Sequence, residues 1–305
     1  MNLKTGIAAQ TITSSEALLR QLTPQLLDPL ARDLANQVQW WSLPGLVPCS
    51  TSEPESYPVA ITGEGAPVLL LHGFDSSFLE FRRLAPLLSP HHQLVIPDLY
   101  GFGFSPRPPE ADYGQEALIR HLDELLAHLP SNSPVGVIGA SMGGAIAMEL
   151  ARRHPKQINR LLLLSPAGLT GRPKPIPPGL DQLGAWILSQ PAVRRSICRQ
   201  AFADPKNSVG DAEEQIASLH LQVSGWRSSL AAFARSGGIA NCGTPLPQQP
   251  LHVIWGANDR ILNGPQRREA LTLLGSHVEE LDNCGHLPHL DHPKIVAQRW
   301  LQAFS

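Results

Sequence analysis

The sequence has little of what marks several protein classes. Charged residues make up only 16% of its 305 residues and the formal net charge is −2, so the basic excess typical of nucleic-acid-binding proteins is missing. Its cysteines form no Cys-x-x-Cys pair, which argues against a zinc site or a dense disulfide framework. We therefore expect no nucleic-acid partner and no metal. The four cysteines are interpreted as mostly buried thiols: Cys49, Cys198, Cys242 and Cys284.

Membrane features are also scarce. No apolar run is long enough to span a bilayer, and residues 1–13 lack the basic start, apolar core and cleavage site of a secretory signal. We expect a cytoplasmic protein without an integral membrane segment. After a capping box at residues 13–16, leucines recur at helical spacing with breaks at Pro24 and Pro29. They predict broken amphipathic helices packed on the main domain, and peripheral membrane contact by the first 45 residues stays open.

Apolar residues are plentiful, at 42%, and from residue 58 strand and helix patterns alternate. Before that point, Trp40 and Trp41 predict a helix stop, and the Pro- and Ser-rich chain up to Pro58 predicts a linker or the first edge of a sheet. Strands are expected at residues 59–62, 68–71, 92–97, 135–138, 160–165, 251–255 and 277–281, and helices at 78–88, 114–129, 145–153, 266–274 and 295–304. This alternation predicts an α/β fold with a mostly parallel central sheet flanked by helices.

The alternation stops for about 80 residues, where helical segments follow one another without a buried-strand pattern. These segments, at 180–189, 192–202 and 212–236, predict an inserted helical cap whose Trp186 and Trp226 can line a substrate pocket. The predicted organisation has three parts. They are an N-terminal helical extension and linker at 1–57, an α/β core at 58–166 and 247–305, and the cap at 167–246.

A nucleophile elbow is predicted at residues 136–144. There a short apolar run ends in Gly-x-Ser-x-Gly and passes directly into a helix-forming segment, the context in which this pattern presents a reactive serine. Ser141 is the candidate nucleophile. Gly139 and Gly143 supply the small neighbours that such a tight turn needs.

A serine nucleophile needs a base near neutral pKa and an acid that orients this base. Asp259 and His286 each lie just past a predicted strand, and carboxyl ends of parallel strands share one edge of a sheet, so their loops can meet that of Ser141. Acyl transfer also needs two oxyanion donors. The backbone N–H groups of Met142 and Phe74 are the candidates, whereas His72 is interpreted as a structural hydrogen-bonding residue.

The chain resembles the α/β-hydrolase superfamily, in its cap-bearing serine hydrolase branch (AB hydrolase-1 type). The similarity spans residues 68 to 305, and its motifs occur in the family's order: His72-Gly73-Phe74, residues 98–105, the elbow, residues 256–259, Gly285-His286 and Asp291-His292-Pro293. The resemblance implies an α/β-hydrolase fold with Ser141 as nucleophile, His286 as base, Asp259 as orienting acid, and Phe74 and Met142 as oxyanion donors. It also implies that the cap covers the active site and that no cofactor is needed.

Differences between this sequence and the motifs of individual subfamilies reduce the number of reactions that we expect. Ser141 stands where haloalkane dehalogenases and epoxide hydrolases of this fold carry Asp, which favours acyl chemistry. Residues 165–169 are similar to monoacylglycerol-lipase-like members, which favours a small-molecule carboxylic ester with an apolar portion. Carbon–carbon bond hydrolases share Gly-x-Ser-Met-Gly-Gly and the pair Asp259-Arg260, but often place Trp where this chain has Leu287, another candidate substrate-binding residue.

Two alternatives therefore stay open. One is carbon–carbon bond hydrolysis of the meta-cleavage type, which a cap arginine facing Ser141 (Arg194, Arg195 or Arg199) would favour. The other is a capped hydrolase scaffold that binds a ligand with low turnover. The spacing of His286, His289 and His292 is not interpreted as a zinc site.

Overall fold

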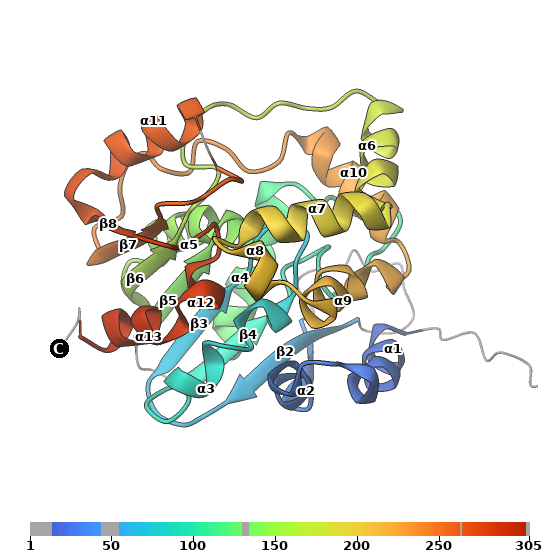
Figure 1. The fold of residues 1–305 in the computed structure, drawn as a ribbon, viewed down its shortest axis with the longest axis horizontal. Coiled ribbons are helices and arrows are strands. Elements are labelled where there is room, and N and C mark those ends of the chain that lie inside the picture. Colours follow the sequence, from blue (N-terminus) through green and yellow to red (C-terminus); the bar gives the residue numbers. More distant parts are fainter. Residues whose placement is uncertain (1–13, 44–54, 130–133, 263, 303–305) are drawn as a thin grey trace, which may run out of the picture.

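An eight-stranded sheet forms the centre of the molecule (Figure 1). The computed structural model describes residues 14–43, 55–129, 134–262 and 264–302. The strand order is β1-β2-β4-β3-β5-β6-β7-β8; β2 runs antiparallel to its neighbours β1 and β4, and the other neighbours are parallel. The strands are β1 Val38–Ser42, β2 Ser56–Thr62, β3 Pro67–Leu71, β4 Gln93–Pro97, β5 Val135–Ala140, β6 Ile158–Leu164, β7 Leu251–Gly256 and β8 Val278–Leu281. The predicted α/β class with a mostly parallel sheet is confirmed.

Helices cover both faces of this sheet because its central strands are apolar on both sides. Along β5, Val137 points into one buried cluster and Ile138 into the other, as expected from the two-residue period of a strand. The first cluster includes residues of α4, α5 and α11, and the second includes residues of α1, α2, α3 and α13. The helices are α1 Ser15–Leu22, α2 Pro29–Ala35, α3 Ala85–Leu88, α4 Gln115–His128, α5 Met142–Arg153, α11 Gly264–Leu274, α12 Pro288–Asp291 and α13 Pro293–Gln302.

Between β6 and β7 the chain leaves the sheet and forms a group of helices that extends from the upper right to the centre of Figure 1. They are α6 Leu180–Ser189, α7 Pro191–Ala201, α8 Pro205–Ser208, α9 Asp211–Leu219 and α10 Trp226–Ser236. Helix α6 packs against α10, and α7 packs against α9. None of the helices in the described parts of the chain is long and apolar enough to cross a membrane.

Several local predictions were wrong. Trp40 and Trp41 lie in β1, which pairs with β2, and not at a helix stop. The helix expected at 78–88 is a 3₁₀ turn followed by the short α3, and the one expected at 212–236 is broken at Gly225, whose φ of 80° is left-handed. These breaks depend on tertiary packing, which helical periodicity does not encode.

Some expectations concern residues near or within the parts that are not described. Ser14 is the N-cap of α1 and its hydroxyl accepts the backbone N–H of Ala17, whereas Thr13 lies outside the described residues. Cys49 and residues 1–13 also lie outside them. The described cysteines, Cys198, Cys242 and Cys284, are free and buried, as expected.

Candidate active site

The turn between β5 and α5 holds Ser141 in a rare backbone conformation, with φ 50° and ψ −117°. Backbone atoms approach so closely here that a side chain would not fit at the neighbouring glycines. A Cβ on Gly143 would lie 2.1 Å from the Leu71 carbonyl oxygen, and one on Gly139 would lie 2.4 Å from the Gly143 carbonyl oxygen. The two glycines are therefore needed for the strained turn that presents the Ser141 hydroxyl.

Ser141 and Asp259 each lie within hydrogen-bonding distance of His286. His286 Nε2 is 2.9 Å from Ser141 Oγ, and His286 Nδ1 is 2.9 Å from Asp259 Oδ2. Because a carboxylate only accepts, Nδ1 carries the proton and Nε2 is left to accept from the serine hydroxyl. All three side chains are largely buried. The strand-end loops thus bring together the three residues that the sequence singled out.

The surroundings of Asp259 keep it ionised. Burial alone would raise the pKa of this carboxyl, but the hydrogen bond and charge interaction with His286 and the backbone donors Leu262 and Ile261 outweigh burial and hold the pKa below its usual range. Both backbone N–H groups donate to Oδ1 at 2.9 Å, and the Trp255 indole donates to Oδ2 at 3.0 Å. The carboxylate is fixed and charged, as a partner of an imidazolium must be.

The loop after β3 lies against the elbow. A Cβ on Gly73 would lie 3.3 Å from Ser141 Cβ, and Phe74, Ser141 and Met142 line one small pocket together. Met142 is the first residue of α5, so its N–H belongs to the helix turn whose donors have no partner within the helix. The candidate oxyanion donors therefore flank the candidate nucleophile.

His72 supports the loop after β3 through two hydrogen bonds. Its Nε2 accepts the backbone N–H of Leu99 at 3.0 Å, so its Nδ1 carries the proton and donates to the Gly73 carbonyl at 2.8 Å. Burial lowers the pKa of this imidazole to about 4, so the ring is neutral. With both nitrogens engaged, its geometry fits a structural role better than that of a second base.

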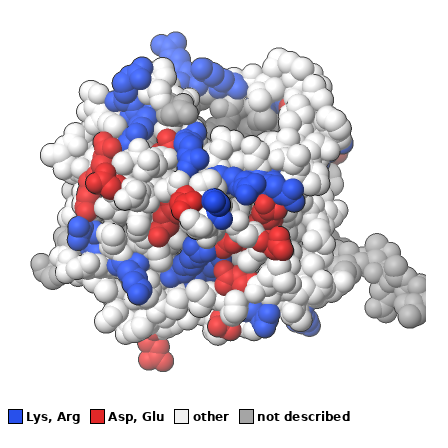
Figure 2. All heavy atoms as spheres, viewed as in Figure 1, with Lys and Arg blue, Asp and Glu red and all other residues white. Residues whose placement is uncertain are grey.

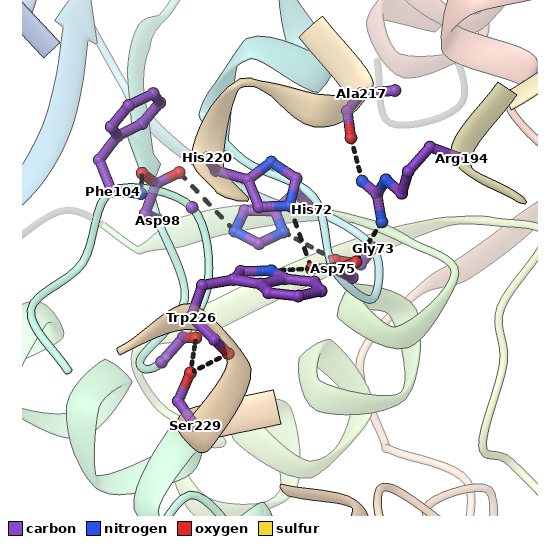
Figure 3. A network of polar contacts seen from close by, with 12 residues as sticks. His72, Gly73, Asp75, Asp98, Phe104, Arg194, Ala217, His220, Trp226 and Ser229 are labelled. Atoms are coloured by element: carbon purple, nitrogen blue, oxygen red, sulfur yellow. Dashed lines mark hydrogen bonds and ion pairs between the residues drawn. The ribbon is translucent and has the colours of Figure 1, made fainter. Parts of the chain in front are cut away.

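Asp75, the residue after Phe74, joins the loop to the helices between β6 and β7 (Figure 3). Its Oδ1 accepts from His220 Nε2 at 3.0 Å and from Trp226 Nε1 at 2.8 Å, and its Oδ2 forms an ion pair with Arg194. Burial disfavours the charged carboxylate, yet His220, Arg194 and Trp226 together lower its pKa to about 2. Three segments from between β6 and β7 thus converge on one buried carboxylate beside a candidate oxyanion donor.

A cavity of about 210 Å³ opens beside Ser141. Its lining combines apolar side chains with charged ones, and the charged ones include Asp75 in the loop after β3, Arg194 of α7 and Glu213 of α9. The apolar members include Leu188, Ile197, Ala201, Phe202, Ile216, Leu287 and Leu290. Leu287 is the predicted substrate-binding residue that lies here; Trp226 lies instead in the Asp75 network, and Trp186 is on the outer face of α6, 47% exposed.

Sequence reasoning missed a second buried carboxylate behind the loop. Glu80 Oε2 accepts the Gly73 N–H at 3.3 Å, and Glu80 Oε1 lies 3.1 Å from His289 Nε2. Burial opposes ionisation of Glu80, but its contact with His289 lowers the pKa to about 2. Nothing in the local pattern marks Glu80, because its role depends on packing; Asp75 could have been noticed as an acid directly after a buried strand and His-Gly-Phe.

No group of three His, Cys, Asp or Glu side chains that could hold a metal ion occurs among the described residues.

Comparisons with known proteins place this geometry in context. A family model described as the alpha/beta hydrolase family matches residues 68–299. Lipase 3 of Moraxella sp. (strain TA144) is 45% identical over 262 residues, which cover 78% of this chain and 76% of the lipase. A 2-hydroxymuconate semialdehyde hydrolase of Pseudomonas sp. (strain CF600) is 30% identical over 250 residues, 76% of this chain and 84% of that protein. The solved structure of the epoxide hydrolase CorEH without ligand has a TM-score of 0.71 at 21% identity, covering 88% of this chain and 98% of the other, and shows likeness of fold alone.

Proposed function

The chain belongs to the alpha/beta hydrolase family, and on that premise we propose that it is a serine hydrolase that cleaves a carboxylic ester with an apolar portion. The observation that carries this proposal is the continuous hydrogen-bonded path from Ser141 through His286 to Asp259. An activated serine next to a correctly oriented imidazole is the arrangement that acyl transfer requires.

The proposed reaction proceeds in two stages. As Ser141 Oγ attacks the ester carbonyl, His286 Nε2 takes the hydroxyl proton, and the charged ring is stabilised by Asp259. The oxygen of the tetrahedral intermediate faces the N–H groups of Phe74 and Met142. His286 then gives its proton to the departing alcohol, which leaves an acyl enzyme on Ser141. Water, deprotonated by the same imidazole, releases the acid.

The apolar part of the substrate is inferred from the cavity. Much of its lining consists of aliphatic and aromatic side chains, such as Ile197, Phe202 and Leu287, and these favour a hydrocarbon chain over a charged group. The likeness to Lipase 3 supports the same substrate class. The helical segment at 167–246 is proposed to be the cap that shapes this acyl or alcohol pocket.

Carbon–carbon bond hydrolysis is a second candidate, supported by the likeness to the semialdehyde hydrolase. It needs a cationic group near Ser141 to stabilise a dienolate. Arg194 does line the cavity with Ser141, but its charge is balanced by Asp75, and Arg195 pairs with Glu214 on the outside of the cap. This balance makes ester hydrolysis the better-supported reaction.

Hydrolysis of p-nitrophenyl esters of increasing acyl length tests the proposal, with Ser141→Ala and His286→Ala proteins measured in parallel. We expect turnover that depends on both residues, with an optimum above acetate. A vinylogous diketone substrate is the parallel assay. Turnover of the diketone alone would favour the second candidate. Absence of turnover in both assays, with no labelling by a fluorophosphonate probe, would favour a low-turnover binding scaffold.

A further inference from the structure

Helix α6 exposes its large apolar side chains to solvent. Leu180 is 58% exposed, Leu183 47%, Trp186 47% and Ile187 42%. Their spacing places them on one side of the helix, whereas the small Ala185 is buried on the opposite side, where α6 packs against α10. Together with Ile176, which is 40% exposed, these four residues are called the α6 surface. Several large apolar side chains exposed on one helix face are typical of an interaction site.

Basic residues border the α6 surface. Arg172 and Lys174 lie in the exposed segment that leads into α6, and the Arg227 side chain donates to the Gln182 carbonyl of α6 itself. The one acidic residue of α6, Asp181, is buried and paired with Arg235. In Figure 2 the upper right of the molecule, where Figure 1 draws α6, is white; Lys and Arg side chains lie along its left and lower border, and Asp and Glu side chains lie beside those of the lower border.

The α6 surface also adjoins the route to the candidate nucleophile. Leu188, the next residue of α6, lines the cavity that contains Ser141. Leu188 also lines a neighbouring groove of about 260 Å³, together with Ile176, Lys174 and Phe74. An apolar molecule held at the α6 surface would thus be close to the cavity.

We propose that the α6 surface docks on a lipid surface that contains anionic lipids. A helix with Leu, Ile and Trp on one face and basic neighbours gains free energy by burying the apolar face at the acyl boundary while the cations stay among the headgroups. The docking rests on exposure and charge. Its role in delivering an apolar ester to Ser141 rests on the proposed function. A second copy of the chain is the competing occupant, but the basic border would face itself in such a dimer, which disfavours that arrangement.

Vesicle co-sedimentation of the full-length Ser141→Ala protein tests the docking without any turnover of lipid. The probes are phosphatidylcholine vesicles with and without phosphatidylglycerol. The double variant Leu180→Glu/Leu183→Glu removes two apolar contacts and adds negative charge. Leu27→Glu is the matched control, because Leu27 is 56% exposed and lies outside the α6 surface. We expect binding that increases with phosphatidylglycerol, falls roughly tenfold or more in the double variant, given the value of burying large apolar side chains, and is unchanged in the control.

Three results would overturn the proposal. They are no binding to either vesicle type, equal binding by the double variant, and a concentration-dependent dimer that the double variant abolishes. The same substitutions in a protein with Ser141 intact should leave hydrolysis of soluble p-nitrophenyl acetate unchanged, which confirms folding. Vesicle binding without any ester turnover would refute the proposed function but leave the docking intact. Ester turnover without vesicle binding would refute the docking but leave the proposed function intact.

Discussion

The indole N–H of Trp226 donates a hydrogen bond of 2.8 Å to Asp75 Oδ1, and this bond connects the first turn of α10 to the residue that follows Phe74. His220 and Arg194 meet the same carboxylate. The position of these segments from between β6 and β7 and the position of a candidate oxyanion donor therefore depend on one buried group. A carboxylate at this depth is stable only while its partners are in place.

Replacing this carboxylate should weaken catalysis as well as stability. In Asp75→Asn, Arg194 loses its buried counter-charge, and the contact between the loop that carries Phe74 and helices α7 and α10 is weakened. We expect kcat for a short ester to fall roughly tenfold to a hundredfold, somewhat less than the loss of a whole oxyanion donor. KM should change little. The free energy of unfolding should fall by up to about 3–5 kcal/mol.

Asp181→Asn is the control for that experiment. It breaks another Asp–Arg pair, Asp181 of α6 with Arg235 of α10, and the hydrogen bonds of Asp181 run to Arg235 and Gly179 instead of the Asp75 network. We expect kcat for the short ester to stay within twofold of the wild-type value (roughly the scatter of a neutral substitution). An equal loss of kcat in both variants would show that cap stability alone, and not the link to Phe74, is responsible.

Acid should destabilise the protein partly through His121. This imidazole is fully buried beside Tyr57 and Tyr100, and neither of its ring nitrogens has a hydrogen-bond partner among the described residues. Burial lowers its pKa from 6.5 to about 3. The folded state therefore binds a proton at His121 more weakly than the unfolded state does. Above pH 6.5 neither state is protonated there and the free energy of unfolding is not reduced. As the pH falls from 6.5 toward 3, protonation of the unfolded state lowers the free energy of unfolding.

His121→Phe should therefore flatten the pH dependence of unfolding below pH 6.5. Urea unfolding at several pH values between 7 and 4 gives the slope of the free energy of unfolding against pH. In the variant this slope should be smaller by the value for one proton, about 1.4 kcal/mol per pH unit. His128→Phe, an exposed site on the same helix α4, should leave the slope unchanged. An unaltered slope in the His121 variant would show that the ring is not held neutral by burial.

A larger side chain at Ile197 should shorten the preferred acyl chain. Ile197 lines the cavity beside Ser141 and is 37% exposed, so α7 can accept a substitution there. In Ile197→Trp we expect kcat/KM for long acyl esters to fall relative to acetate, roughly tenfold for a few lost methylene contacts. Val193→Trp, on the same helix and not among the described lining residues, is the matched control. An unchanged chain-length profile would place the acyl group elsewhere.

Much of the fold was predictable because its central strands are continuously apolar. The strand at β3 was expected within one residue of its observed bounds, since burial on both faces leaves little ambiguity. The edge strand β1 was missed. Its two tryptophans pair with a strand about 18 residues away, and a short segment of this kind gives no periodicity to separate it from a helix end.

The candidate site was predictable where it depends on strand ends. Ser141, Asp259 and His286 follow β5, β7 and β8, so alternation of strands and helices was enough to bring their loops to one edge. The pocket was less predictable. Trp226 was expected to face substrate, but its indole N–H bonds Asp75, a contact that arises only when the cap docks.

The most direct test of the proposed chemistry is the rate at which a fluorophosphonate probe labels Ser141. A serine activated by His286 should react covalently and be identified by peptide mapping. The His286→Ala protein, folded by circular dichroism, should label at least about a hundredfold more slowly, as expected from loss of a general base. No labelling of the wild-type protein, or equal rates in the two proteins, would contradict the assignment of Ser141 as an activated nucleophile.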